Sequence, residues 1–173
     1  MDIPIGAIIN IGSKIAEYFG LIEGIDTKMT KLLQQSFNSA RLNFEYAQNA
    51  TGQNQMDYIK TAKDKFIEAV SVEENENKVL ALAGLAMCQL FLKDDANAKL
   101  TIDSIKSLEL SKGECNKAKV ADVALQIYKL NPGYLAIKVF MPIPNVSYTK
   151  IRQDCFSKTK DAALTLIENI YTS

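Results

Sequence analysis

The side chains that could do chemistry in this chain are acidic pairs, cysteines and lysines, because the sequence contains no histidine. Adjacent carboxylates occur at Glu73 and Glu74 and again at Asp94 and Asp95. Such pairs can serve in acid–base catalysis or hold a metal ion. Both pairs stand where a new helix is expected to begin, and carboxylates there accept hydrogen bonds from unpaired backbone N–H groups. Helix capping therefore explains them, and we predict no catalytic, cofactor-binding or metal-binding residue.

The three cysteines, Cys88, Cys115 and Cys155, are odd in number and far apart, and no CxxC spacing occurs. Together with the lack of histidine, this excludes the usual zinc ligand sets and the Ser-His-Asp and Cys-His forms of catalysis. Cys88 lies in an apolar run, so we interpret it as a buried small side chain. We expect reduced thiols and a cytoplasmic location.

The charge balance argues against nucleic acid as a partner. The 173 residues include 20 basic and 20 acidic side chains, without a long basic block, whereas nucleic-acid binding depends on an excess of lysine and arginine. No glycine-rich phosphate loop is present, so we predict no cofactor. The length fits one domain with a sizeable core. The sequence contains no uninterrupted run of ~20 apolar residues, so we predict no membrane-spanning helix.

The stretch from Asp57 to Ile105 organises the chain, since its pattern predicts three successive amphipathic helices. The first carries Ala62, Phe66 and Ala69, a small–large–small set at helical spacing. Small residues let a neighbouring helix approach closely while the large one fills the gap. Two further segments repeat this spacing: Ala40, Phe44 and Ala47, and Ala98, Ile102 and Ile105.

The middle helix of this stretch, Lys78 to Leu92, is apolar on nearly all of its faces. A helix of that kind is normally buried on several sides. We therefore expect it at the centre of the core, with Asp94 or Asp95 capping the helix that follows.

Residues 57–110 resemble a tetratricopeptide repeat. The equivalent alanines Ala62 and Ala98 are 36 residues apart, close to the repeat period of about 34. Leu82, Leu85 and Ala86 fall where that family has a large residue followed by a Leu-Gly pair. Gln89 departs from the family, which usually has an aromatic residue there, and Lys93 stands where the family usually has a glycine. The resemblance implies stacked antiparallel helical hairpins that bind polypeptides. The same spacing also suits other helical hairpins.

Residues 3–22 predict an apolar N-terminal helix. Its functional interpretation is a membrane-surface anchor or a helix that packs into a partner's groove. The alternative is a helix packed on its own domain, which we favour because the polar face is not basic. The predicted apolar stripe consists of Ile5, Ile8, Ile9, Ile15, Ala16, Phe19 and Ile22.

We place helical hairpins over residues 27–130. Asp26 or Thr27 can cap their first helix, which reaches about Ala50, and Ser111 can cap the last, which ends before the sequence Asn-Pro-Gly at 131–133. A closing helix is predicted over residues 147–171. Its predicted apolar side is Ile151, Cys155, Ala162, Leu166 and Ile170, and its predicted solvent side is Arg152, Lys158, Lys160 and Asp161.

The apolar loop 131–146 holds the candidate partner-binding residues. Aromatic residues and methionine are enriched at interfaces, although the loop can instead cover the open end of the helical stack, which we prefer. The candidates are Tyr134, Phe140, Met141 and Ile143.

Together these patterns predict one all-α domain over residues 1–173, with about seven helices in stacked antiparallel hairpins and a C-terminal closing helix. We expect a non-enzymatic protein–protein interaction module of the adaptor, scaffold or inhibitor type, whose partner is another protein or peptide. The first alternative is a peripheral membrane protein anchored by residues 3–22. The second is an enzyme that uses only carboxylates and lysines.

Overall fold

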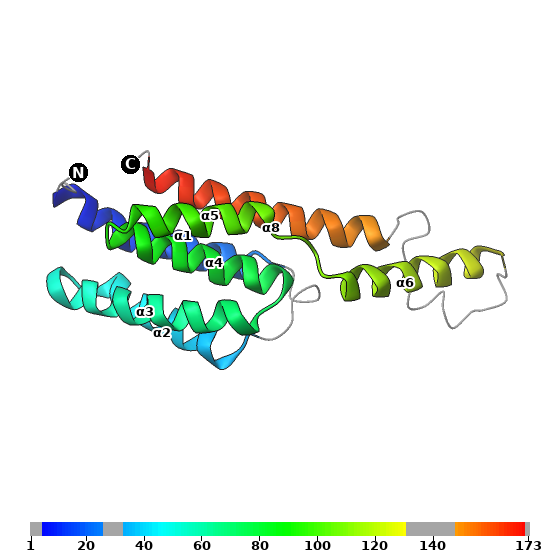
Figure 1. Ribbon diagram of the computed structural model, residues 1–173, viewed down its shortest axis with the longest axis horizontal. Coiled ribbons are helices and arrows are strands. Elements are labelled where there is room, and N and C mark those ends of the chain that lie inside the picture. Colours follow the sequence, from blue (N-terminus) through cyan, green and yellow to red (C-terminus); the bar gives the residue numbers. More distant parts are fainter. Residues whose placement is uncertain (1–4, 26–32, 131–147, 172–173) are drawn as a thin grey trace. The chain divides into compact units, whose positions relative to one another are not determined.

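The computed structural model describes residues 5–25, 33–130 and 148–171, which form helices joined by short turns, with no strand among these residues (Figure 1). The predicted all-α class is therefore confirmed. The helices are α1 (Ile5–Glu23), α2 (Gln35–Asn49), α3 (Gly52–Val72), α4 (Asn75–Phe91), α5 (Asp95–Ser107), α6 (Lys112–Leu130) and α8 (Tyr148–Tyr171).

The chain divides into two compact units. Unit 1 comprises residues 1–108 and 159–173, and unit 2 comprises residues 109–158. Helix α8 therefore contributes its last part to unit 1 and its first part to unit 2. The prediction of a single domain over the whole chain stays a prediction.

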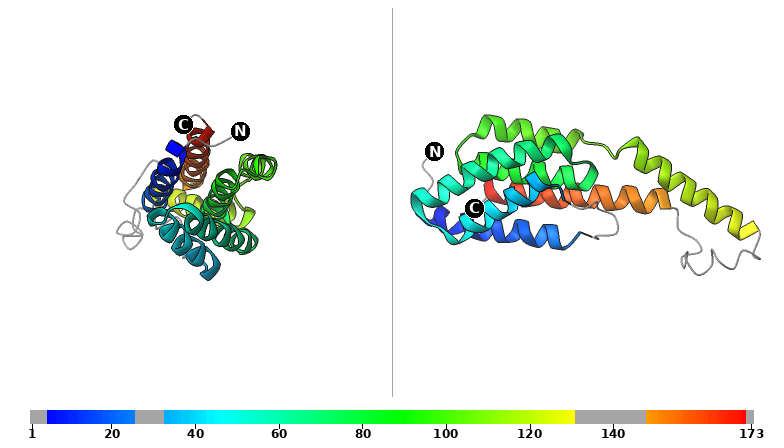
Figure 2. Two further views of the ribbon diagram at one scale, coloured as in Figure 1. Left: turned by 90° about the vertical axis from the view of Figure 1, so that its left-hand side faces the viewer. Right: turned by 90° about the horizontal axis from the view of Figure 1, so that it is seen from below.

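Helix α4 lies in the middle of unit 1, as its all-round apolar sequence predicts. Every residue from Val79 to Phe91 is buried. Helices α3 and α5 pack against it, and α1 contacts both α4 and α2. The view along the helix axes in Figure 2 shows α4 surrounded by these neighbours. The core of unit 1 is therefore built around one helix with almost no polar side.

The small–large–small sets form the contacts between successive helices. Helix α2 packs on α3, α3 on α4 and α4 on α5, so neighbours in sequence are neighbours in space. The sets on α2 and α3 are fully buried, whereas the set on α5 has one half-buried member, Ile102. The buried members are Ala40, Phe44 and Ala47 on α2, Ala62, Phe66 and Ala69 on α3, and Ala98 and Ile105 on α5.

Four aromatic rings meet where α1, α2 and α3 come together. Phe66 is at their centre, with ring centroids 5.9 Å from Tyr18, 5.7 Å from Phe37 and 5.2 Å from Phe44. The rings meet edge to face, the arrangement that the charge distribution of aromatic rings favours. All four are fully buried, so this cluster fixes how the three helices pack.

Gly84 on α4 provides the space for the Phe66 ring. A Cβ atom added at Gly84 would lie 2.5 Å from Cε1 and 2.6 Å from Cε2 of Phe66, far inside van der Waals contact. Nearby, the buried Tyr18 hydroxyl donates a hydrogen bond to the Leu80 carbonyl oxygen, with 2.7 Å between the oxygens. Helices α1, α3 and α4 are thus held together at one point by ring packing and one buried hydrogen bond.

The face that α1 buries differs from the predicted stripe. Ile11, Ile15 and Tyr18 are buried at spacings of four and three residues, whereas the predicted Ala16 is exposed and Phe19 is half-buried. Only Ile15 belongs to both sets among the side chains that the structure describes. The apolar residues of α1 are broadly spread around the helix, so tertiary contacts, and above all the Tyr18 hydrogen bond, select the buried side.

Helix α2 begins at Gln35, not near Thr27 as predicted. Leu33 and Gln34 are non-helical, and the residues from 26 to 32 lie outside the described range. The Gln34 backbone N–H donates to Oε1 of Glu73 across 2.6 Å. A carboxylate distant in sequence therefore accepts the hydrogen bond at the helix start, which a local capping pattern cannot reveal.

The last part of α8 runs beside α5 in unit 1. The Lys160 ammonium donates to the carbonyl oxygens of Lys106 and Leu108 at the end of α5. At the other end, partial burial and then the negative charge of Asp95 raise the pKa of Tyr171. The two helices are therefore antiparallel, and Lys160, predicted to point to solvent, instead caps the C-terminus of α5.

Unit 2 contains α6 and the first part of α8. Ser111 caps α6 as predicted, because its Oγ accepts a hydrogen bond from the Glu114 backbone N–H at 3.4 Å. Arg152 is buried, contrary to the prediction, and its Nε lies 3.5 Å from Oε2 of Glu114. Phe156 is buried on the same side of α8, so the buried face is shifted by one residue from the predicted stripe through Ile151 and Cys155.

Candidate functional site

The four candidate partner-binding residues all lie in the segment 131–147, outside the described residues. The assignment of Tyr134, Phe140, Met141 and Ile143 therefore stays a prediction. A candidate site within the described residues has to be found from exposed side chains and from polar groups whose role the fold does not explain.

One carboxylate of each acidic pair accepts a hydrogen bond at the start of a helix. Asp94 caps α5, since Oδ1 accepts from the Asn97 backbone N–H at 3.4 Å and Oδ2 from the Asn97 side-chain amide at 2.8 Å. Glu73 is buried and accepts from Gln34 at the start of α2, whereas the prediction assigned it to the start of α4. Within the described ranges, no three His, Cys, Asp or Glu side chains gather in a way that could hold a metal ion.

Cys88 is a buried free thiol in unit 1, which confirms the prediction that it acts as a small core side chain. Burial raises the pKa of this thiol well above its ordinary value. The thiol form is not nucleophilic, so Cys88 is unsuited to covalent catalysis. Cys115 and Cys155 are likewise thiols and are half-buried.

Gln89 and Thr101 form a buried polar contact between α4 and α5. The Thr101 hydroxyl donates to Oε1 of Gln89 across 2.8 Å. Because buried polar groups must find partners to avoid a desolvation cost, this pair explains why a glutamine is tolerated on the buried helix α4. Its role is to align two helices.

Glu114 and Arg152 form an ion pair in unit 2. Partial burial of Glu114 acts to raise the pKa of its carboxyl, but the Lys117 hydrogen bond and the positive charges of Lys117 and Arg152 outweigh it and hold the pKa below its ordinary value. Lys117 Nζ lies 3.3 Å from Oε1. The carboxyl is therefore ionised at neutral pH and neutralised by two cations, which suits an ion pair and not a general acid.

A group of exposed apolar side chains lies on the outer side of the α2–α3 hairpin. Leu42 and Tyr46 on α2 are 46% and 48% exposed, and Tyr58 on α3 is 38% exposed. The Tyr46 and Tyr58 rings contact each other, with centroids 5.3 Å apart and planes inclined by 45°. Leu42 precedes Tyr46 by one helical turn, so it lies on the same face of α2. We call these three residues the tyrosine surface.

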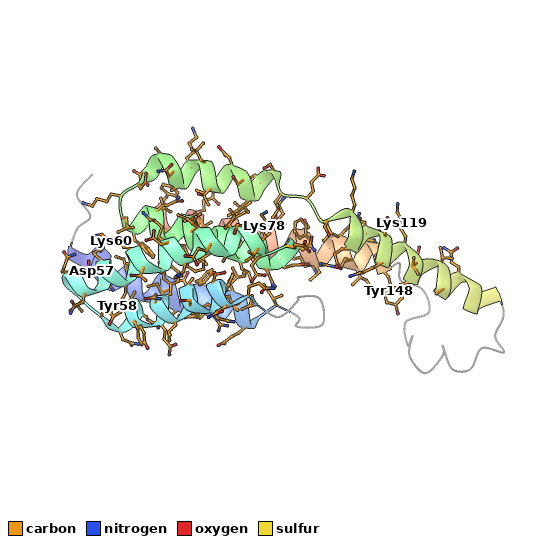
Figure 3. The ribbon with its side chains drawn as sticks, turned by 60° about the horizontal axis from the view of Figure 1, so that its bottom comes forward. Asp57, Tyr58, Lys60, Lys78, Lys119 and Tyr148 are labelled. Atoms are coloured by element: carbon orange, nitrogen blue, oxygen red, sulfur yellow. The ribbon has the colours of Figure 1, made fainter. Side chains whose placement is uncertain are left out.

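Carboxylates accompany the tyrosine surface. The exposed Glu45 and Asp57 directly precede Tyr46 and Tyr58. Asp57 accepts a hydrogen bond from Gln53 at 2.8 Å and lies 3.8 Å from Lys60 Nζ, and Figure 3 shows Asp57, Tyr58 and Lys60 at the end of the hairpin where α2 passes into α3. The tyrosines are thus an apolar centre with an ionic edge, which is the composition of many protein interfaces.

A second exposed apolar group lies on α6 in unit 2. Val120 and Val123 are 69% and 54% exposed, whereas Ala118 on the opposite side of the helix is buried. Lys112 and Lys119 are exposed and fall on the same side as Val123, because they precede it by eleven and four residues. Figure 3 shows Lys119 projecting from α6 on the side away from Tyr148 of α8. We call Val120 and Val123 the valine face.

Sequence reasoning missed the tyrosine surface and the valine face because it searched each helix for the side that packs inward. The available signal was a pair of large apolar residues four positions apart, Leu42 and Tyr46, on the side of α2 opposite its small–large–small stripe. In α6 no inward side was predicted, so nothing indicated that Val120 and Val123 would be 69% and 54% exposed.

Comparison of the chain with protein-family models, curated proteins and solved structures finds no match. In the described part of the chain, no helix has the length and apolarity that a membrane crossing requires.

Proposed function

We propose that this chain is a protein-binding module without catalytic activity, and that its tyrosine surface holds a segment of another polypeptide. The observation that carries the proposal is the pair of Tyr46 and Tyr58 rings, which touch each other yet remain 48% and 38% exposed. Tyrosine offers a large contact area with few rotatable bonds, so it loses little conformational entropy on binding. For that reason aromatic residues are enriched at interfaces.

The rigidity of the hairpin supports this proposal. The residues opposite the tyrosine surface, including Phe44 and Ala47, are fully buried, and the buried Gln55 side chain donates to the Ala47 carbonyl oxygen at 2.9 Å across the turn. A surface on two well-packed helices needs little reorganisation when a partner binds. The tetratricopeptide-like stacking of residues 57–110 and a reducing, cytoplasmic location belong to the same proposal.

The two alternatives have less support. A membrane anchor would use the apolar side of α1, but Ile11, Ile15 and Tyr18 are already buried within unit 1. An enzyme using carboxylates and lysines would need a convergent set of them, and Glu73, Asp94 and Glu114 each have hydrogen-bonding or ionic partners that account for them.

A site-specific photo-crosslinker tests the proposal. The amino acid p-benzoylphenylalanine replaces Tyr46 in one variant and Leu100 in another, and both are expressed in the cells that make the protein naturally. Leu100 is a matched control because it is an exposed apolar residue, 65% exposed, on α5. We expect a crosslinked polypeptide from position 46 that is absent from position 100 and is lost when Leu42→Glu is added. Equal crosslinking from both positions, or none from position 46, would overturn the proposal.

A further inference from the structure

We propose that the polypeptide held by the tyrosine surface is a second copy of this chain, seated through the valine face of its α6. The inference rests on the proposed function, because it names the partner of the same surface. It would make the protein a head-to-tail self-assembling module.

The first argument is the separation of charge between the two units. Unit 2, residues 109–158, has eight basic and four acidic side chains, a formal charge of +4. The remaining residues, which make up unit 1, have twelve basic and sixteen acidic side chains, a formal charge of −4. The chain is neutral only because these two values cancel. Opposite potentials on two molecules steer their encounter and favour one orientation.

The second argument is that each unit has an exposed apolar group with flanking charges of the sign that suits the other. Tyr46 and Tyr58 follow Glu45 and Asp57, whereas Lys119 lies one helical turn from Val123 on the same side of α6 and Lys112 lies farther along that side. Asp57 is also 3.8 Å from Lys60 Nζ, and Asp122 directly precedes Val123, so the match of sign depends on Glu45, Lys119 and the net charges of the two units. A contact between them would bury apolar side chains in the centre and place carboxylates near ammonium groups at the rim. That arrangement matches the usual anatomy of an interface, an apolar centre with a polar edge.

The third argument concerns symmetry. The two surfaces are different and belong to different units, so a contact between them is heterologous. Each copy would offer one tyrosine surface and one valine face. Such a contact builds chains or rings whose length depends on concentration. Because each surface is small, we expect weak association, with a Kd on the order of 10 µM or higher.

Sedimentation velocity of the full chain measures this association. We expect the weight-average mass to rise with concentration at low ionic strength and to fall back toward the monomer at about 0.3 M salt, where the Debye length is only several ångströms. A chain that stays monomeric at low salt and at concentrations far above the expected Kd would overturn the inference.

Single-surface variants identify the two contact sites. Tyr46→Glu disrupts the tyrosine surface and Val120→Glu disrupts the valine face, and both positions are exposed, so the fold is retained, as circular dichroism would verify. We expect each variant alone to associate at least about tenfold more weakly, a change of about 1.4 kcal/mol. Leu100→Glu on α5 is the control and should assemble like the unmodified chain.

Mixing the two variants gives the decisive result. The Tyr46→Glu chain keeps its valine face and the Val120→Glu chain keeps its tyrosine surface, so an equimolar mixture should form a dimer of one copy of each and grow no further. A mixture that stays monomeric, or a single variant that still dimerises alone, contradicts head-to-tail contact. If the chain is monomeric but position 46 crosslinks a different polypeptide, the inference fails and the proposed function stands.

Discussion

The two units of this chain hold their helices together by different means. Unit 1 packs its helices around α4, which is buried from Val79 to Phe91, and around a cluster of aromatic rings centred on Phe66. Within the described residues of unit 2, the ion pair of Glu114 with the buried Arg152 joins α6 to α8, and Ala118 and Phe156 are buried on these two helices. One unit therefore depends on shape and the other on charge, and they should respond differently to mutation, pH and salt.

The largest effect is expected from removing the ring at the centre of unit 1. Phe66→Ala should lower the free energy of unfolding by about 3–5 kcal/mol, because it deletes a fully buried aromatic ring among three others. Urea denaturation followed by circular dichroism measures the loss. Ile67→Ala is the matched control, because Ile67 is the next residue along α3 and is 52% exposed. It should change stability by less than about 0.5 kcal/mol. Equal losses would contradict the central role of Phe66.

A smaller effect is expected from filling the space under that ring. Gly84→Ala should destabilise unit 1 by about 1–3 kcal/mol, because the new methyl group collides with the Phe66 ring. Gly20→Ala in α1 is the control: no atom lies within 4 Å of its added Cβ, so it should stabilise by about 0.5–1 kcal/mol through helix propensity. Adding Phe66→Leu to Gly84→Ala should recover part of the loss, and strictly additive effects would contradict direct contact.

Unit 2 should be the part that responds to acid. Glu114 has a lowered pKa in the folded chain, so it contributes stability above its unfolded pKa, and that stability is lost as pH falls through its folded pKa. Glu114→Gln at neutral pH should cost about 1–2 kcal/mol, since the buried Arg152 loses a charged partner. Amide hydrogen exchange, corrected for its intrinsic pH dependence, should rise in α6 but not in α4. Uniform acid sensitivity in both helices would refute the comparison.

The smallest effect concerns a polar contact at the edge of unit 1. Asp94→Ala removes the N-cap of α5 and should cost about 1 kcal/mol. Thermal unfolding measures it, with Asp95→Ala as the control at the neighbouring exposed carboxylate. A loss as large as that of Phe66→Ala would mean that polar edges, and not the apolar core, dominate the stability of unit 1.

The sequence predicted the helices well because their strongest signals are local. Ala62, Phe66 and Ala69 share one side of α3 under any packing, and α4 is apolar on so many sides that only a central position suits it. Both expectations are confirmed. The cap at Asp94 is equally local and is also confirmed.

The errors arise where contacts distant in sequence decide the outcome. The start of α2 depends on Glu73, 39 residues away from its hydrogen-bond partner Gln34. In α8, two overlapping apolar stripes are available, and Glu114 on another helix selects the one that buries Arg152. No periodicity within a helix contains that information.

The candidate site was less predictable than the fold for a related reason. Patterns of buried residues reveal which side of a helix packs inward, but a binding surface consists of residues left over from packing. Tyr46 and Tyr58 become a joint surface only when α2 and α3 pair and bring their rings to 5.3 Å. The spacing of Leu42 and Tyr46 places them on one side of α2, but nothing in the sequence pairs Tyr46 with Tyr58.

Because of where its thiols lie, the unmodified protein can report its own local unfolding. Cys88 is sealed inside unit 1, so an alkylating reagent can reach it only during the brief openings of that unit. Cys115 in unit 2 is half-buried, so we expect it to react faster and to serve as a reference in the same tube. Mass spectrometry of the two peptides over a labelling course would therefore compare the opening-limited reaction of Cys88 with the direct reaction of Cys115 in one sample, with no engineered probe.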